Sequence, residues 1–434
     1  MVIKKDFVVS LFIASSVLGV AVSYSKLYLF HISLMILFAY FLISLSHNNF
    51  KIKKILLPSK FHSLFYLMFL WYAITLLWSI DTKLTMNYLF YIFCGMVISL
   101  TIIYYSTNQE KQTKLFKVLS VFFFIHIILS LLEVYTPFRL PISPYSNYLS
   151  YFGRGAGDEA AFGIPNATNI PTGFQWNPNN FATTMTIIFP FFLLHPKKSI
   201  KVLGILAIIT LVIASESRGN VLALCLIVII YLFFTNKKRT MMFGSFFGGA
   251  ALLFSLFISP ILSNSDNYKI REVYSSVESL KLYLNPTGDY QLDSIGVRHM
   301  LIERGIQGLK DTYGIGVGGG ASNALSPING VQSMHNFWIE LLVEGGVIFF
   351  SIFVFWYIAL TLKLFKVYKR AKDTKIRYYS LSLFLSMIGF SFGAVSASTV
   401  IYLFPMWIMF GFAIATINNY IQSQITKPLE RTAN

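Results

Sequence analysis

Charged side chains are scarce in this chain, and acidic ones are the scarcest. Only 12% of the 434 residues are charged and only 18 are Asp or Glu, whereas 55% are hydrophobic. Soluble domains carry about 25% charged residues. The composition therefore excludes an ordinary soluble enzyme and indicates a polytopic membrane protein.

Cysteine and the motifs of common cofactor enzymes are also nearly missing. Cys94 and Cys225 both lie inside apolar runs, where neither is placed for a disulfide across an outer loop or for a metal site. The chain has no D-x-D, H-E-x-x-H, Walker or G-x-S-x-G motif. We therefore expect no metal and no cofactor, and no use of cytosolic ATP or nucleotide sugars.

Positive charge is present, but in a pattern that argues against nucleic acid as a partner. The net charge is +17, and most Lys and Arg residues lie in short segments between apolar runs. This is the pattern of cytoplasmic loops rather than of a nucleic-acid surface. With a cytoplasmic N-terminus, every strongly basic segment and the C-terminus fall on the cytoplasmic side.

Long apolar runs predict the fold class. A spanning helix needs about twenty mostly apolar residues, and the sequence predicts an all-α integral membrane protein with about twelve such helices. The expected spans lie near residues 7–23, 28–46, 62–79, 86–105, 117–135, 180–195, 201–215, 219–235, 242–261, 337–362, 378–396 and 399–418.

Two polar intervals divide these spans. We expect five spans in 1–135, a first outer loop in 136–179, four spans with the SESRG turn in 180–262, a second outer loop in 263–336, and three spans with a cytoplasmic tail in 337–434. Both outer loops are long enough to hold short helices.

The second outer loop contains the first functional candidate, Arg298. If residues 296–311 form a helix, Arg298 shares a face with Leu301, Gly305 and Leu309, while a wetter face carries Glu303. An unpaired guanidinium on a packing face is costly, so Arg298 needs a partner there.

Two further candidates face the same compartment. Arg218, in the SESRG turn, has two equally weighted interpretations: a contact with phospholipid headgroups or a bidentate clamp on phosphate. His335 precedes a span, with Asn336 beside it and Glu340 about one turn on. A lone interfacial histidine is more often structural, but an imidazole also relays protons at neutral pH.

The candidate substrate-binding residues are Asn177, Asn179, Asn336, Arg154 and Glu340. For the two asparagines of the first loop, a turn that caps the sixth span is favoured over direct contact with substrate. The run Gly314–Gly319 matches G-x-G-x-x-G by letter, but no strand precedes it. A glycine-rich turn that lets helices approach closely is the better interpretation.

Four stretches resemble the O-antigen ligase/polymerase superfamily of bacterial integral-membrane glycosyltransferases. They are GFQWNPNNFA at 173–182, Ser217-Arg218-Gly219 before an apolar span, Arg298 before a helix and the glycine turn, and His335-Asn336 followed by Glu340 and Gly345. The first departs from the family pattern because Gln175 and Trp176 stand between Phe174 and Asn177.

The resemblance implies a location and an activity. The family's outer arginines map to Arg218 and Arg298 and its outer histidine to His335. Members work in the bacterial cytoplasmic membrane, without metal or nucleotide. They move a glycan from an undecaprenyl-pyrophosphate carrier to an acceptor hydroxyl, which belongs to a glycan or a lipid-linked molecule. Membrane lipids and other polysaccharide-assembly proteins are the further partners expected.

Several alternatives stay open at this point. A polymerase extends a lipid-linked repeat unit, whereas a ligase passes the glycan to a final acceptor such as lipid A core. The residues of the four stretches do not distinguish a polymerase from a ligase, and we lean modestly to a polymerase. A lipid-linked oligosaccharide flippase is an alternative from a different functional class. A flippase would be expected to have ionisable residues in the middle of its membrane spans and small outer loops. A non-catalytic scaffold does not explain the outer arginines.

Overall fold

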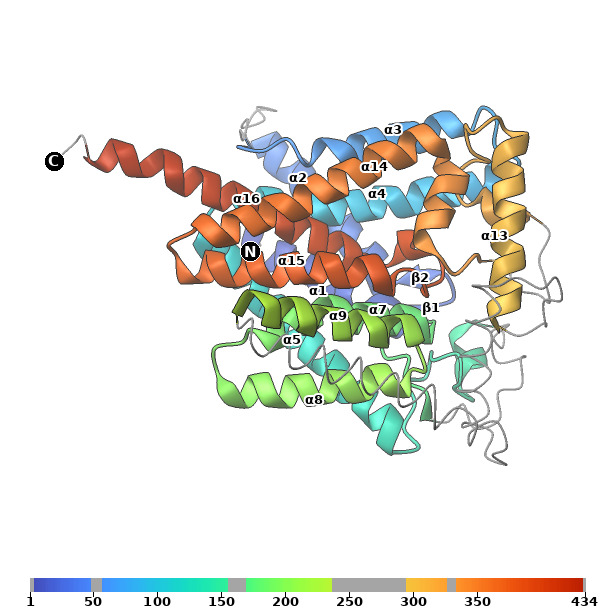
Figure 1. Ribbon diagram of the computed structural model, residues 1–434, viewed down its shortest axis with the longest axis horizontal. Coiled ribbons are helices and arrows are strands. Elements are labelled where there is room, and N and C mark those ends of the chain that lie inside the picture. Colours follow the sequence, from blue (N-terminus) through green and yellow to red (C-terminus); the bar gives the residue numbers. More distant parts are fainter. Residues whose placement is uncertain (1–3, 48–56, 155–168, 236–293, 326–332, 432–434) are drawn as a thin grey trace.

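The computed structural model describes residues 4–47, 57–154, 169–235, 294–325 and 333–431. Most of its helices run side by side in one bundle (Figure 1). The helices are α1 Lys5–Leu18, α2 Leu29–His47, α3 Ser63–Thr75, α4 Thr82–Tyr105, α5 Gln109–Tyr135, α7 Pro178–Leu193, α8 Lys198–Ala214, α9 Arg218–Thr235, α13 Ser294–Asp311, α14 Phe337–Arg370, α15 Thr374–Gly393 and α16 Phe404–Arg431.

Shorter elements lie in the connections. They are the two-stranded antiparallel hairpin β1 Ser23–Tyr24 and β2 Leu27–Tyr28, and the short 3-10 helices η1 Gly19–Ala21, η2 Leu149–Phe152, η5 Ala321–Ala324 and η6 Val400–Tyr402. Side chains start several of the long helices. Asp81, Asn108 and Asp373 each accept a hydrogen bond from a first-turn amide of α4, α5 and α15, respectively.

The all-α membrane prediction is confirmed. In the described part of the chain, five helices are long and apolar enough to cross a membrane: α2, α4, α5, α14 and residues Phe404–Ile425 of α16. Two shorter apolar helices lie at Ser63–Thr75 and Arg218–Phe234. The expected span at 242–261 lies outside the described residues, so the count of twelve and the five-part division of the chain stay predictions.

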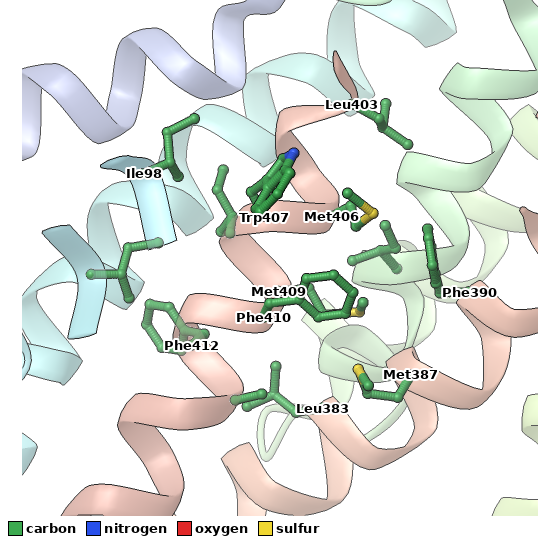
Figure 2. Packing of buried hydrophobic residues seen from close by; sticks show 14 of the residues in the cluster. Ile98, Leu383, Met387, Phe390, Leu403, Met406, Trp407, Met409, Phe410 and Phe412 are labelled. Atoms are coloured by element: carbon green, nitrogen blue, oxygen red, sulfur yellow. The ribbon is translucent and has the colours of Figure 1, made fainter. Parts of the chain in front are cut away.

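The core of the bundle is built around α16. In its most apolar window 83% of residues are buried, against 17% for α2, so α16 is central and α2 is peripheral. Figure 2 shows Trp407, Phe410 and their apolar neighbours in this core. A side chain at Gly95 of α4 would come within 2.1 Å of the Trp407 indole, so glycine lets α4 and α16 pack closely, as small residues do in membrane helices.

One end of the bundle differs from the other because α13 lies across it (Figure 1). Beneath α13, the long helix α14 is interrupted at Gly346, whose φ of 77° and ψ of 170° are not helical. The glycine-rich turn fits into this break: Val317 N–H donates to Val343 O at 2.9 Å, and Val347 N–H donates to Gly314 O at 2.9 Å. The break and the turn together hold α13 against the start of α14.

Candidate active site at the α13 end of the bundle

Arg218 is the first residue of α9, in the turn that follows α8, and its side chain is exposed. Buried polar side chains fix the turn on both sides of it. Asn220 Nδ2 donates to Ser217 Oγ at 2.9 Å and to Ser396 Oγ at 3.1 Å, and Asn220 Oδ1 accepts from Thr186 of α7 at 2.9 Å. The turn is therefore tied to α7 and to the connection between α15 and α16.

His335 lies one residue before the N-cap of α14. Asn336 is the cap, and its Oδ1 accepts hydrogen bonds from the Trp338 and Ile339 amides. The start of the helix is held against α15, because Phe337 N–H donates to Ala394 O at 3.0 Å and the Trp338 indole donates to Ser391 O at 2.9 Å. His335 itself has a left-handed φ of 47°, a conformation that non-glycine residues adopt rarely and that clusters at functional sites.

Arg298 lies on the packing face of α13, as the helical periodicity predicts. Leu301, Gly305 and Leu309 are buried on that face, while Glu303 is exposed and pairs with His299 at 3.4 Å. Gly305 packs against Met334, the residue before His335. This contact sets the position of α13 relative to the start of α14 and so brings Arg298 towards His335.

The three predicted residues come together at this end of the bundle. Burial lowers the pKa of Arg298, and the positive charge of Arg218 lowers it further. Burial lowers the pKa of His335 to about 4, and the charge of Arg298 contributes. Burial is the larger cause of both shifts, but the contribution of each arginine to its neighbour's pKa requires the charges to lie close together. The two guanidinium groups and the imidazole therefore share one electrostatic environment.

Two properties of this cluster bear on its chemistry. At neutral pH the imidazole is uncharged, and its buried Nδ1 has no hydrogen-bond partner within the described residues. In that same part of the chain no carboxylate forms an ion pair with Arg298. Like charges held close together on partly buried groups are unfavourable, and a bound anion would relieve this repulsion.

Sequence reasoning missed Ser396, which joins the two halves of the cluster. Its Oγ contacts Ser217 at 3.2 Å and Asn220 at 3.1 Å, and its backbone carbonyl lies against the His335 ring, where it partly offsets the lowering of the pKa. The small-residue segment 396–399, with hydroxyl side chains at Ser396, Ser398 and Thr399, is the signal that could have pointed to it, because such residues hydrogen-bond across helices in membranes.

The first-loop candidates have structural partners. Asn177 caps α7 by accepting from Asn179 N–H at 2.7 Å, so the capping prediction is confirmed. Arg154 donates to Ser23 Oγ and Ser25 O, both at 3.1 Å, and stacks on Trp176 at 4.9 Å. These contacts tie the loop to the β1–β2 hairpin, and a role of the three residues in substrate binding stays a prediction.

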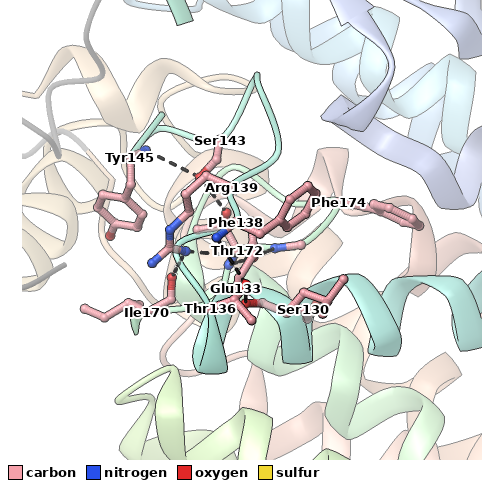
Figure 3. A network of polar contacts seen from close by, with 12 residues as sticks. Ser130, Glu133, Thr136, Phe138, Arg139, Ser143, Tyr145, Ile170, Thr172 and Phe174 are labelled. Carbon is pink, nitrogen blue, oxygen red and sulfur yellow. Dashed lines mark hydrogen bonds and ion pairs between the residues drawn. The ribbon is translucent and has the colours of Figure 1, made fainter. Parts of the chain in front are cut away.

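A buried carboxylate on α5 holds the first outer loop against that helix. Glu133 Oε2 accepts from the amides of Thr172 and Gly173 at 2.9 and 2.8 Å and lies 4.0 Å from Arg139, which donates to Ile170 O at 2.7 Å (Figure 3). Burial lowers the pKa of Arg139, and the nearby carboxylate opposes that effect. The network fixes the segment that leads into the Asn177 cap.

Glu340 points into the protein beneath the glycine turn. Its Oε1 accepts from the Tyr88 hydroxyl at 2.6 Å, and Glu344, one turn on, accepts from Ser322 at 2.6 Å. Both side chains are almost fully buried. Sequence reasoning did not single out Glu344, and its i, i+4 spacing from Glu340 was the available signal.

The glycine-rich turn serves close packing. A side chain at Gly316 would come within 2.5 Å of Glu344 O, and one at Gly346 within 2.4 Å of Ile315 O. Within the described ranges, no group of three His, Cys, Asp or Glu residues could hold a metal ion. The expectation of a reaction without metal stays a prediction.

Part of the chain is similar to known proteins. Residues 203–354 match the family model described as O-antigen ligase, and this range contains Arg218, Arg298 and His335. This match supports the resemblance to the O-antigen ligase/polymerase superfamily. It is also similar to the teichuronic acid biosynthesis protein TuaE of Bacillus subtilis (strain 168). The two are 24% identical over 379 residues, which cover 84% of this chain and 72% of TuaE. The apolar helices and the family match together indicate a multi-pass membrane protein of bacteria. The first-loop candidates, at positions 154, 177 and 179, lie before the matched range.

Proposed function

We propose that this protein transfers a glycan from an undecaprenyl-pyrophosphate carrier to an acceptor hydroxyl at the outer face of the cytoplasmic membrane. The family match and the apolar helices support a membrane protein of polysaccharide biosynthesis. The observation that carries the finer proposal is the shared environment of Arg218, Arg298 and His335.

In this proposal the two arginines bind the pyrophosphate. When the sugar leaves, negative charge grows on the phosphate oxygens, and guanidinium groups stabilise it most where water is excluded. Arg298 is well suited, because it is largely buried and carries positive charge next to Arg218. The α9 N-terminus, where Arg218 lies, adds the partial positive charge of the helix dipole.

His335 handles the acceptor. The acceptor oxygen attacks the anomeric carbon, and the bond from that carbon to the pyrophosphate oxygen breaks, with its electron pair leaving on undecaprenyl pyrophosphate. The hydroxyl proton passes to the neutral imidazole and from there to the departing pyrophosphate or to water. A bound pyrophosphate neutralises Arg298, so it raises the pKa of His335 towards its ordinary value and makes the ring a stronger proton acceptor.

We favour a polymerase that extends surface polysaccharide repeat units, with a ligase acting on a final acceptor as the alternative. A deletion strain separates the two by the lengths of its lipid-linked glycans. Loss of long chains supports the polymerase. Accumulation of long chains on the carrier supports the ligase.

The reaction itself is tested with purified protein in liposomes and a defined undecaprenyl-pyrophosphate oligosaccharide. We expect longer glycans and release of undecaprenyl pyrophosphate, with equal rates with and without a chelator. A strict requirement for a divalent metal contradicts the mechanism. Transport of the intact donor without any transfer contradicts the enzyme assignment and supports the flippase class.

A further inference from the structure

A groove of about 450 Å³ lies towards the other end of the bundle, between α5, α7, α8, α15 and α16. Its walls come from the last turns of α7, with Ile188 and Phe192, and the first turns of α15, with Tyr378. The α13 end of the bundle holds the opposite ends of these two helices, because Asn177 begins α7 there and α15 ends beside His335. The groove is thus separate from the arginine cluster.

The groove is apolar and opens on the lipid-facing surface. Its lining includes Val121, Phe124 and Ile125 of α5, which are 56%, 54% and 39% exposed. Its volume lies within the range of small-molecule pockets, about 300–1,000 Å³. Because α5 is one of the helices long and apolar enough to span the membrane, the medium at the mouth of the groove is hydrocarbon. An apolar chain is therefore the ligand class that fits the interior.

Positive charge surrounds the end of the groove that points away from α13. His195 and Ile200 line this end, and Lys197 and Lys198, between them in the sequence, are exposed. Lys117 is also exposed and lies one turn from the lining residue Ser120 on α5. Lysine side chains at a membrane surface attract anionic headgroups. The acidic side chains at this end include Asp6 and Glu110, which pair with Lys114, and Asp373, which accepts a hydrogen bond from Gln109.

We propose that this groove binds one anionic phospholipid of the inner leaflet. One acyl chain lies in the groove between α5 and α8, and Lys197, Lys198 and Lys117 hold the headgroup. The charge of the rim favours this occupant over a neutral lipid. The leaflet follows from the predicted cytoplasmic position of the basic segments. The site does not depend on the proposed transfer reaction, because it shares no residue with the arginine cluster.

The test measures lipid binding by native mass spectrometry and by thermal shift of the purified full chain. The probes are dioleoyl phosphatidylglycerol and dioleoyl phosphatidylcholine. We expect the phosphatidylglycerol to bind more tightly and to raise the melting temperature more. The Lys197→Gln/Lys198→Gln variant should lose this preference, with about fivefold weaker binding for each lysine removed. The matched control Lys363→Gln/Lys366→Gln removes the same charge from α14 and should keep the preference.

A second pair of variants tests the groove itself. Ile125→Trp fills it and should weaken the binding of both lipids, whereas Ile358→Trp, on the exposed face of α14, should leave binding unchanged. Equal binding of the two lipids by the wild type overturns the proposal. So does binding that the tryptophan at position 125 leaves unaltered, or displacement of the phosphatidylglycerol by undecaprenyl phosphate, which assigns the groove to the carrier. None of these readouts measures glycan transfer, so they do not bear on the proposed reaction.

Discussion

The positive charge of Arg298 acts on the imidazole of His335, although Arg298 lies on α13 and His335 lies in the segment that leads into α14. The contact of Gly305 with Met334 produces this relationship, since it lays α13 on the segment that carries the histidine. Burial and the neighbouring charge both disfavour the imidazolium form. The geometry of the helices thus keeps a neutral imidazole beside two cations.

This arrangement predicts a pH dependence of stability. The pKa of His335 is lowered from 6.5 to about 4 in the folded protein, so the unfolded chain binds the proton more strongly between these values. Stability should be greatest above pH 6.5 and should fall as the pH drops towards 4, by on the order of 3 kcal/mol at most from this residue. Thermal unfolding of detergent-solubilised protein between pH 4.5 and 7.5 measures the effect.

The variant His335→Gln should flatten the pH dependence of unfolding in that range. His47→Gln, at the exposed end of α2, is the control and should leave the slope unchanged. An equal slope in the wild type and in His335→Gln would show that other groups cause the acid sensitivity.

Replacing Arg298 tests its proposed contact with pyrophosphate. Arg298→Lys keeps the charge but loses the planar fork that binds two phosphate oxygens. We expect transfer from the undecaprenyl-pyrophosphate donor to fall by about 100-fold, which is the scale for loss of one transition-state donor. Arg304→Lys, on the exposed side of the same helix, should retain full activity. Full activity of Arg298→Lys would remove Arg298 from the mechanism.

Ser396 should act as a positioning residue. Ser396→Ala removes the hydroxyl that contacts Ser217 and Asn220 but keeps the backbone carbonyl beside His335. We expect weaker donor binding, seen as a KM several-fold higher with a smaller change in kcat, because the Arg218 turn loosens. Ser398→Ala, a buried neighbour, is the control. A loss of kcat alone, with KM unchanged, contradicts this role.

The sequence allowed the helices and the three outer residues to be predicted, because each signal is local. Apolar runs mark spans, and the period of about 3.6 residues placed Arg298 on the packing face of α13. The partners of Ser396 and Glu344 lie 179 and 22 residues away in the chain, so a local pattern could point to these two residues but not to the contacts they make. The break in α14 was equally hidden, since Gly345-Gly346 reads as part of an apolar helix.

This break in α14 predicts the effect of a small substitution. Alanine at Gly346 would have to adopt a φ of 77° and would place its Cβ 2.4 Å from Ile315 O, a backbone atom that moves only with the turn. We expect Gly346→Ala to lower stability by roughly 1–3 kcal/mol and to reduce activity, because α13 rests on the same turn. Gly308→Ala meets only side chains at 3.2 Å or more and should be milder. Equal melting temperatures for the two variants would contradict this account.

The buried carboxylate of Glu133 should decide whether the first outer loop stays on α5. Glu133→Gln keeps an oxygen that accepts from the amides of Thr172 and Gly173, but it removes the negative charge beside Arg139. Breaking a buried pair on one side leaves the other charge uncompensated, so we expect a loss of about 3 kcal/mol and faster proteolysis within residues 136–177. Glu110→Gln removes a charge that is 80% exposed and should change neither. Because the loop leads directly into the Asn177 cap, a Glu133→Gln protein with wild-type stability and protease resistance would mean that the Asn177 cap and Arg154 are enough to hold the loop in place.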